Sequence, residues 1–259
     1  MSHSPLVAPG LGLEQPRRRA LLASAIGLAG SGSLLTLTGC GGGSADSASV
    51  RFVNATVDYA TADFWAQGDK LSSALANGGT PSGWSSIDSG DGQVELHAAG
   101  SGSSKLTETH SFTKDGYTTA IAYGALATSM KFKYLDESNA AASSGSTKVR
   151  LFHAAASLGA LDVYITNTSS LSGLSPTLQV SAYEELSSFV SIANDSYRVR
   201  ITSSGNQSNV LFDFTTLLNL ASKAVITLVI VPRASGSLPN MTALAEQSVS
   251  ALMSNALVS

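Results

Sequence analysis

Val149-Arg150-Leu151-Phe152-His153-Ala154 repeats a pattern that the chain has already used at Val50-Arg51-Phe52-Val53-Asn54-Ala55, and this pair of stretches decides the fold. A second matching pair, Asp63-Phe64-Trp65 and Asp162-Val163-Tyr164, follows the first pair at the same offset. Self-similarity of this kind is typical of chains built from repeated structural units. The sequence therefore predicts two homologous units.

The similarity continues beyond these motifs at a drifting offset. Residues 91–96 align with residues 194–199, so that Leu96 is aligned with Val199. Each stretch is expected to be a turn that leads into a strand. Leu135-Asp136-Glu137 aligns with Leu244-Ala245-Glu246. The drift indicates insertions in loops of the second copy. The expected boundaries are residues 50–137 for the first unit, 138–148 for an Ala/Ser/Gly-rich linker, 149–246 for the second unit and 247–259 for a C-terminal tail.

The spacing of apolar residues predicts β-strands in both units. Residues 225–231 form a β-branched run that predicts a strand buried on both faces, and residues 117–123 are its counterpart in the first copy. Residues 198–201 alternate arginine with apolar residues, which predicts one solvated and one buried face. Short strands between Gly, Ser, Asn and Asp turns favour an all-β fold of two tandem β-sandwiches. A helical alternative stays open for residues 214–220 and, as a terminal helix, for residues 243–257.

The repeated signature resembles a known family. Val149-Arg150-Leu151-Phe152-His153-Ala154, followed by Asp162-Val163-Tyr164, is similar to the family catalogued as domain of unknown function 4397, whose bacterial envelope domains carry a strand like V-R-x-x-H-A and then V-D-V-Y. The resemblance covers both units, although the first has Asn54 in place of the histidine and neither copy keeps the family's proline-rich turn. It implies tandem immunoglobulin-like sandwiches on an exported protein, and it implies no reaction.

The N-terminal segment has the three parts of an export signal. Arg17-Arg18-Arg19 forms a positive n-region, residues 20–37 form an apolar segment, and Leu37-Thr38-Gly39-Cys40 resembles the bacterial lipobox. In that signal a diacylglyceryl thioether forms on the cysteine before cleavage ahead of it. We therefore expect residues 1–39 to be a cleaved signal peptide, Cys40 to be lipidated, and residues 40–49 to form a flexible tether.

Two alternatives stay open for this segment. An uncleaved membrane anchor needs about 20 mostly apolar residues, and residues 20–37 are barely long enough and are rich in glycine and serine. Arg18-Arg19-Ala20-Leu21-Leu22 resembles the twin-arginine export pattern, although the same arginines also suit an ordinary basic n-region. Lipidation implies a bacterial cell envelope, and Gly41, in place of the aspartate associated with inner-membrane retention, favours the outer membrane.

The charge balance excludes several classes of function. The chain has 15 basic and 18 acidic residues; loss of residues 1–39 removes three arginines and Glu14, which leaves 12 basic and 17 acidic residues and a net charge of −5. Without a basic cluster, nucleic-acid binding by a cationic face is not expected, and membrane attachment rests on the acyl chains of Cys40. Cys40 is the only cysteine, so we expect neither disulfides nor thiolate chemistry.

His153 and Asp162 are the strongest candidates for chemistry. If they face each other across paired strands, they form an acid–base or metal pair; otherwise the histidine fixes a loop by hydrogen bonding. The first copy favours the structural interpretation, because it keeps Asp63 but has Asn54, which cannot titrate, in place of His153.

The aromatic residues are the strongest candidates for binding. Trp65 and Tyr164 are equivalent in the two copies, and Trp84 and Tyr183 lie in the loop before the next turn of each copy. Aromatic rings at the ends of a sandwich stack on sugars or anchor a partner protein, but rings that close the core between the sheets are more common.

The sequence leads to two hypotheses of different classes. The first is a non-enzymatic envelope lipoprotein, a structural or interaction module that is anchored to the lipid bilayer through Cys40 and has a protein or glycan partner, with no metal or cofactor. The alternative is an envelope hydrolase or metal-dependent enzyme with a site around His153 and Asp162. Arg51 and Arg150 are expected either on a solvated strand face or paired with the aspartate of the same copy.

Overall fold

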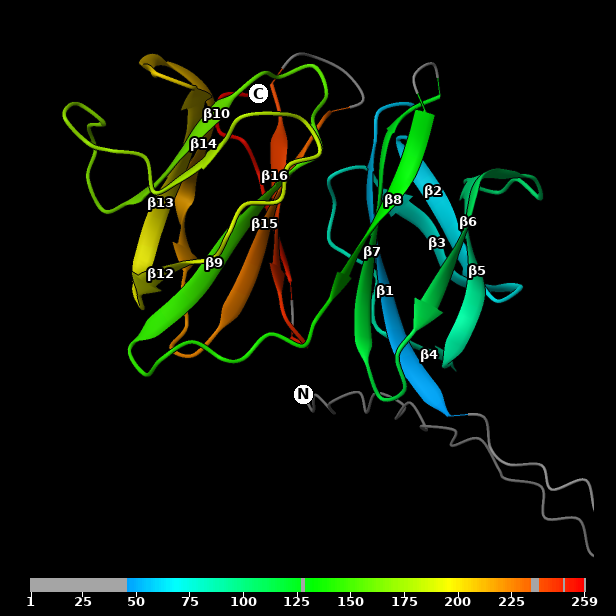
Figure 1. The fold of residues 1–259 in the computed structure, drawn as a ribbon. Helices are drawn as coiled ribbons and strands as arrows, with labels where there is room; N and C mark the ends of the chain where they lie inside the picture. Colours follow the sequence, from blue (N-terminus) through cyan, green and yellow to red (C-terminus); the bar gives the residue numbers. More distant parts are fainter. Residues whose placement is uncertain (1–45, 127–128, 234–237, 249, 259) are drawn as a thin grey trace, which may run out of the picture. The chain divides into compact units, whose positions relative to one another are not determined.

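The computed structural model describes residues 46–126, 129–233, 238–248 and 250–258, and strands are the only regular elements that these residues form (Figure 1). The predicted all-β class is therefore confirmed. The predicted signal peptide, Cys40 and the first residues of the predicted tether lie outside this part of the chain. Among the residues described, no helix is long and apolar enough to cross a membrane.

The first unit forms two four-stranded sheets, which we call sheet A and sheet B (Figure 1). Its strands are β1 (Ser47–Thr56), β2 (Thr61–Ala66), β3 (Asp69–Ala76), β4 (Ser85–Asp88), β5 (Gly90–Ala98), β6 (Ser104–Phe112), β7 (Tyr117–Ala125) and β8 (Ser129–Asp136). Sheet A has the order β4-β1-β7-β8, and sheet B has the order β3-β2-β5-β6. Neighbouring strands are antiparallel except β1 and β7, which pair in parallel.

The second unit repeats this topology in sheets C and D (Figure 1). Its strands are β9 (Ser146–His153), β10 (Leu161–Thr166), β11 (Leu178–Val180), β12 (Val190–Ala193), β13 (Ser196–Ser203), β14 (Asn206–Asn219), β15 (Val225–Val231), β16 (Asn240–Ala245) and β17 (Ala251–Met253). Sheet C has the order β12-β9-β15-β16-β17, with β9 and β15 parallel, and sheet D has the order β11-β10-β13-β14. Strand β17, which falls in the range predicted as a tail, extends sheet C at its edge.

The pairing registers show which residues of the two units are equivalent. Three residues that lie in register across β1, β7 and β8 correspond to three across β9, β15 and β16, namely Arg51, Thr119 and Leu135 in the first unit and Arg150, Thr227 and Leu244 in the second. The predicted alignment of Leu135 with Leu244 is therefore confirmed, and so is that of residues 117–123 with residues 225–231.

The predicted alignment of Leu96 with Val199 is wrong by two positions. Leu96 pairs with Phe64 on β2. The residue equivalent to Phe64 is Val163, and it pairs with Ile201 on β13. Leu96 therefore corresponds to Ile201. A shift of two residues keeps every side chain on its face of the strand, so the alternation of apolar residues cannot reveal it.

Both helical alternatives are wrong. Residues 214–219 continue the long strand β14, and residues 243–257 contain the end of β16, the whole of β17 and non-helical chain. Pairing decides these segments: β14 pairs with β13, and β16 pairs with both β15 and β17. Such contacts between distant parts of the chain override a weak local helical spacing.

The prediction that Arg200 lies on a solvated face is also wrong, because a loop covers that face of β13. Arg200 is 4% exposed. Its Nη1 donates to the carbonyl oxygen of Ser169 at 2.8 Å, and its Nη2 donates to the carbonyl oxygen of Thr168 at 2.7 Å and to the hydroxyl of Thr166 at 2.9 Å. The alternation on β13 is real, but both of its faces are buried at this point.

Each unit has an apolar core between its two sheets. In the first unit Phe52 of sheet A stacks on Phe64 of sheet B, with ring centroids 5.0 Å apart. In the second unit Leu151 of sheet C and Ile201 of sheet D belong to one buried cluster. Successive residues of a strand point to opposite faces, so each strand contributes every second side chain to its core.

A third apolar cluster joins the two units through the outer faces of sheets A and C. The first unit contributes Val53, Ala55, Ile121, Tyr123 and Leu135, and the second contributes Phe152, Ala154, Val229, Val231 and Leu244. By the registers given above, these are the same five positions in each unit. The two units thus meet as the halves of an isologous dimer do, with the same patch on both sides. This contact covers the second face of β15, which is buried along its whole length, as predicted.

Candidate functional site

His153 is fully buried at the end of β9, where it holds the turn that leads to β10. Its Nε2 lies 3.1 Å from the carbonyl oxygen of Gly159, and its Nδ1 accepts a hydrogen bond from the backbone N–H of Ala155 at 3.3 Å. These partners assign the ring proton to Nε2. Burial lowers the pKa of His153 from its ordinary value of 6.5, so the neutral ring is favoured.

Asn54 makes the equivalent contacts in the first unit. Its Nδ2 donates to the carbonyl oxygen of Tyr59 at 3.0 Å, and its Oδ1 accepts from the backbone N–H of Thr56 at 3.2 Å. An amide and an imidazole therefore fix the same turn in the two units, since each offers at least one donor and one acceptor. The contacts that His153 makes do not require a group that titrates.

We expect His153→Asn to fold and to lose part of the acid sensitivity of the protein. The pKa of His153 is lowered in the folded state, so the unfolded chain binds more protons once the pH falls below 6.5, and stability is lost in that direction. The decrease in Tm between about pH 7 and about pH 5 should be smaller in the variant. Thermal unfolding followed by circular dichroism measures it, and an equal decrease in both proteins contradicts this role of the histidine.

Asp162 does not interact with His153 but links strand β11 to the turn after β13 on the outer face of sheet D. Its Oδ1 accepts from the Gln179 amide at 2.9 Å and from the Ser204 hydroxyl at 3.2 Å, and its Oδ2 accepts from the backbone N–H of Gly205 at 2.8 Å. The carboxylate is 3% exposed, and these donors satisfy both of its oxygens. The structure gives His153 and Asp162 separate partners and does not bring them together.

Asp63 has the same position and the same task in sheet B. It accepts from Lys70 Nζ at 2.8 Å and from the backbone N–H groups of Ala74 at 2.8 Å and Gly100 at 3.1 Å. The Lys70 hydrogen bond is the main cause that lowers the pKa of Asp63 to about 2. Because Gly100 and Gly205 occupy the same turn in the two units, both aspartates hold the hairpin that follows the third strand of their sheet.

Trp65 and Tyr164 lie on the outer faces of sheets B and D, next to these aspartates. Trp65 stacks on His97, with ring centroids 5.2 Å apart. Tyr164 is 2% exposed, and its hydroxyl is 3.4 Å from the amide nitrogen of Gln207. A hollow of about 610 Å³ adjoins Tyr164 and Asp162, but the aspartate oxygens there are already paired within the chain.

Arg51 and Arg150 are each held between a threonine hydroxyl and an aromatic ring. The Nε of Arg51 donates to Thr119 at 2.8 Å, and its guanidinium carbon lies 4.5 Å from the centre of the Trp84 ring. The second unit repeats the arrangement. The Nε of Arg150 donates to the hydroxyl of Thr227 at 2.9 Å, and its guanidinium carbon lies 4.5 Å from the centre of the Phe189 ring. Contacts of this kind between a cation and a ring contribute about 0.5–1 kcal/mol or more each.

Trp84 and Tyr183 both lie in the loop before the next turn of their copies, but the residue equivalent to Trp84 is Phe189. Trp84 immediately precedes β4 and Phe189 immediately precedes β12, and these two strands pair at the same positions of β1 and β9. The first unit therefore has an indole where the second has a phenyl ring, and both cover an arginine.

All five N–H donors of Arg51 are engaged. The Nε donates to Thr119. The Nη1 donates to the carbonyl oxygen of Ser248 at 3.1 Å and to the hydroxyl of Ser250 at 2.7 Å. The Nη2 donates to the carbonyl oxygen of Ala245 at 3.0 Å and to the carboxylate of Glu137. Three of these acceptors belong to the second unit, so Arg51 links the two units. The prediction that Arg51 lies on a solvated face or pairs with Asp63 is wrong, since its side chain is 2% exposed and its ion pair is with Glu137.

Glu137 and Glu246, which occupy equivalent positions, are the carboxylates of this junction. Glu137 is 4% exposed and also accepts from the Thr119 hydroxyl and from the backbone N–H of Gln247 at 2.6 Å. Glu246 accepts from the side-chain amide of Asn139 at 2.6 Å. Burial raises the pKa of Glu246, and the nearby charge of Glu137 acts in the same direction. The two units thus exchange polar contacts in both directions around the apolar cluster.

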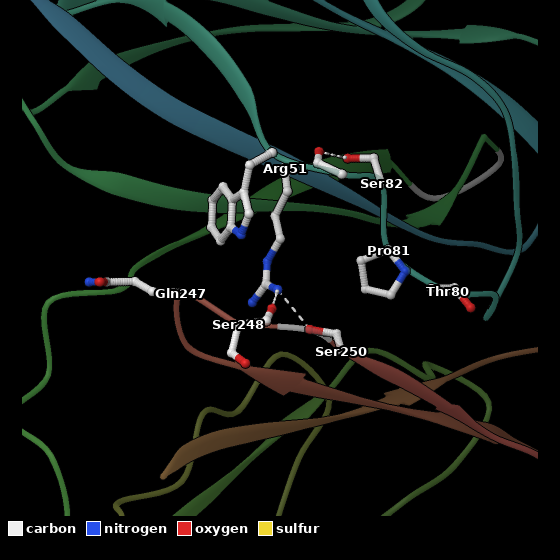
Figure 2. Close-up of a pocket in the computed structure, with 9 residues that line it drawn as sticks. Arg51, Thr80, Pro81, Ser82, Gln247, Ser248 and Ser250 are labelled. Carbon is white, nitrogen blue, oxygen red and sulfur yellow. Dashed lines mark hydrogen bonds between the residues drawn. The ribbon is translucent and has the colours of Figure 1, made fainter. Parts of the chain in front are cut away.

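A cavity of about 420 Å³ lies beside Arg51, between the two units (Figure 2). The first unit lines it with Arg51 and residues 80–84, and the second with Gln247, Ser248 and Ser250. Figure 2 shows Arg51 reaching toward Ser248 and Ser250, with Pro81 and Gln247 on opposite sides of the guanidinium. Its volume falls in the range of small-molecule sites. We call this cavity the junction pocket.

Sequence reasoning singled out Trp84 and Arg51 but did not predict the junction pocket. The other lining residues come from the loop of residues 80–83 and from the range predicted as a tail, and they meet because the units pack together. One signal was present: residues 225–231 were expected to be buried on both faces, whereas a two-sheet sandwich covers only one face of each strand. Among the described residues, no group of three or more His, Cys, Asp or Glu side chains is placed to hold a metal ion.

Two all-β units with the same strand order, joined through equivalent outer faces, define a tandem protein of paired sheets with a pocket at its junction. Residues 48–164 match the model of a family described as "Domain of unknown function (DUF4397)", the same family that the repeated motifs resemble. The match covers the first unit and runs into the second as far as Tyr164 in β10. No curated protein matches the chain.

Proposed function

We propose that the chain is a non-enzymatic lipoprotein of the bacterial cell envelope that binds a protein or glycan ligand in the junction pocket. The pocket is the observation that carries the binding role. Both units build it, and its inner wall is an arginine whose donors are all engaged by the protein itself. The pocket therefore forms only when the two units are joined. The duplication of the unit then creates a binding site and does not merely lengthen the protein.

The proposal extends to the finer architecture of the units. Each would be an immunoglobulin-like sandwich, an assignment supported by its two sheets of short strands and the single apolar core between them. Such a scaffold holds loops such as residues 80–84 at fixed positions, as binding loops require.

Anchoring rests on the sequence Leu37-Thr38-Gly39-Cys40 after a basic and then an apolar segment. We propose that residues 1–39 are removed as a signal peptide after export, with the twin-arginine route supported by Arg18-Arg19, and that acylated Cys40 holds the protein in the outer membrane. Gly41-Gly42-Gly43-Ser44 would then act as a flexible tether that lets the paired units reach a ligand.

Intact-mass analysis of membrane-extracted protein tests the anchor. We expect a mass that corresponds to residues 40–259 plus a lipid modification, and Cys40→Ser should lose both the modification and the membrane association. Cys40 is the only thiol in the chain, so the variant removes the attachment site without altering another cysteine. An unmodified full-length mass in the membrane fraction contradicts the proposal.

The non-enzymatic assignment is supported by the contacts of the two candidate catalytic residues. His153 is buried and pairs with backbone groups of its own turn, and both oxygens of Asp162 accept hydrogen bonds, one from Gln179 on β11 and one from the backbone of Gly205. A general base must reach the proton that it abstracts, and a fully buried ring whose two nitrogens are both paired does not.

A further inference from the structure

We propose that the junction pocket binds a neutral saccharide, about one or two sugar rings in size. This inference rests on the proposed function, because it names the chemistry of the ligand for the same pocket. The argument has three steps: where the two units differ, what the pocket excludes and what it offers.

The loop of the first unit that lines the pocket differs in amino-acid sequence from the equivalent loop of the second unit. Ser82 and Ser187 are equivalent, and each bonds the neighbouring strand through its hydroxyl, Ser82 to Phe52 at 2.8 Å and Ser187 to Leu151 at 2.9 Å. Around this shared anchor, the first unit differs from the second at four positions: it has Thr80 for Glu185, Pro81 for Leu186, Gly83 for Ser188 and Trp84 for Phe189.

The fold does not require these differences, because the second unit forms the same sheets without them. Covering the arginine does not require an indole, since Phe189 covers Arg150 at the same distance of 4.5 Å as Trp84 covers Arg51. What Trp84 adds is a larger apolar surface and an N–H donor. Among the described residues its Nε1 has no hydrogen-bond partner and is not buried, so it is available to a ligand.

The pocket excludes anions as preferred ligands. An arginine recognises phosphate or carboxylate through free N–H donors, and every donor of Arg51 is already paired within the protein. The lining residues include no lysine, histidine or second arginine, and no acidic side chain either. A neutral ligand is therefore the one that this lining fits.

What the pocket offers is apolar walls with neutral hydrogen-bonding groups between them. Trp84 and Pro81 are the ring-shaped wall residues, and the hydroxyl of Thr80 has no partner within the described chain. Ser250 accepts from Arg51, so its own hydroxyl hydrogen remains free to donate. Gln247 uses its amide nitrogen on Glu137 and keeps its oxygen as an acceptor. Sugar rings have the matching character: C–H faces that pack on rings, and edges whose hydroxyls both donate and accept.

A small-ligand site fits better than a peptide groove. An extended peptide gains affinity from main-chain pairing with a sheet edge or from a long aromatic-lined groove. The pocket is lined by Arg51, the loop of residues 80–84, and Gln247, Ser248 and Ser250, and none of these lining residues belongs to the edge strands β4 or β17. Its 420 Å³ suits a compact ligand.

Fluorescence of Trp84 provides the test. The chain has two tryptophans, and Trp65 lies outside the pocket, so Trp65→Phe leaves Trp84 as the only indole emitter. The membrane-extracted protein is kept in a detergent without a sugar headgroup and titrated with maltose, cellobiose and N,N′-diacetylchitobiose. Glucose 6-phosphate is the anionic comparison, and a proline-rich peptide is the alternative occupant. We expect a saturable emission change with at least one disaccharide, with a Kd of about 1 mM or lower.

Two substitutions then locate the site. Thr80→Val removes one exposed hydroxyl and should weaken binding roughly fivefold, the equivalent of one hydrogen bond of about 1 kcal/mol. Trp84→Phe, followed by calorimetry because the emitter is lost, should weaken binding about tenfold while Tm stays the same, since the second unit uses phenylalanine at this position.

Four results overturn the inference. If the peptide saturates the signal and no disaccharide does, the saccharide is wrong but the pocket remains a binding site, so the proposed function stands. If neither the peptide nor any disaccharide saturates the emission signal, the junction pocket is not a binding site, and both the saccharide proposal and the proposed binding role are wrong. The mass measurement at Cys40 still tests the membrane anchor independently. If glucose 6-phosphate binds more tightly than every neutral sugar, or if both substitutions leave disaccharide affinity unchanged, the neutral pocket is not the site.

Discussion

Replacing Arg51 by methionine will lower the free energy of unfolding by about 3–5 kcal/mol, the cost expected when one partner of a buried ion pair is removed. The reason is Glu137, which is 4% exposed and would keep its charge without the guanidinium that compensates it. The Ser248 and Ala245 carbonyl oxygens also lose a donor, which adds to the cost. Methionine fills much of the volume of the arginine stem, so packing loss contributes little.

Arg150→Met is the matched control for this experiment. Arg150 has the equivalent position, the equivalent threonine and the equivalent ring, but its two Nη atoms have no hydrogen bond within the described residues. Its replacement should cost about 1 kcal/mol, for one hydrogen bond and one ring contact. Urea denaturation of both variants compares the two free energies, and similar losses in both would show that the Arg51–Glu137 pair does not hold the junction.

Replacing Val229 by aspartate should lower the free energy of unfolding by about 4 kcal/mol or more, because it buries a carboxylate in an apolar contact. Val229 is completely buried in the cluster between the units, at the position equivalent to Ile121. Both tryptophans lie in the first unit, so their emission reports the unfolding of that unit alone. The urea midpoint of tryptophan emission should therefore fall, although the substitution is in the second unit.

Leu217→Asp provides the control on the surface of the second unit. Leu217 is 55% exposed on β14, outside the apolar clusters, so aspartate there remains solvated and should change the midpoint little. If Val229→Asp also leaves the tryptophan midpoint unchanged, the two units unfold independently, and the junction adds little to the stability of the first unit.

The fold was largely predictable from the sequence, because its signals are local. The V-R motif and the Asp-x-aromatic motif of each copy mark equivalent strands, and alternating or β-branched runs mark the rest. The error of two residues at Leu96 shows the limit of this reasoning, since period-two patterns repeat after two residues. The pairing of Leu96 with Phe64 settles the register, and it depends on loop lengths that no pattern encodes.

The candidate site was much less predictable, because it depends on contacts between the units. On sequence grounds an arginine in an alternating strand is expected to face solvent, and Arg51 is buried because the second unit and the Trp84 ring cover it on the outer face of sheet A. Trp84 was found as an aromatic residue in a loop, but its partners Gln247 and Ser250 are more than a hundred positions away. His153 and Asp162 are prominent in the sequence because each holds a turn of the fold.

The central claim is that the two units form one body through equivalent faces. Urea denaturation tests it when tryptophan emission and far-ultraviolet circular dichroism are both recorded on the same samples. Emission reports the first unit, whereas circular dichroism reports the strands of both. We predict that the two curves coincide and have one midpoint, as in a single cooperative transition. Two separated transitions, with emission following only one of them, would contradict the claim and remove the structural basis of the junction pocket.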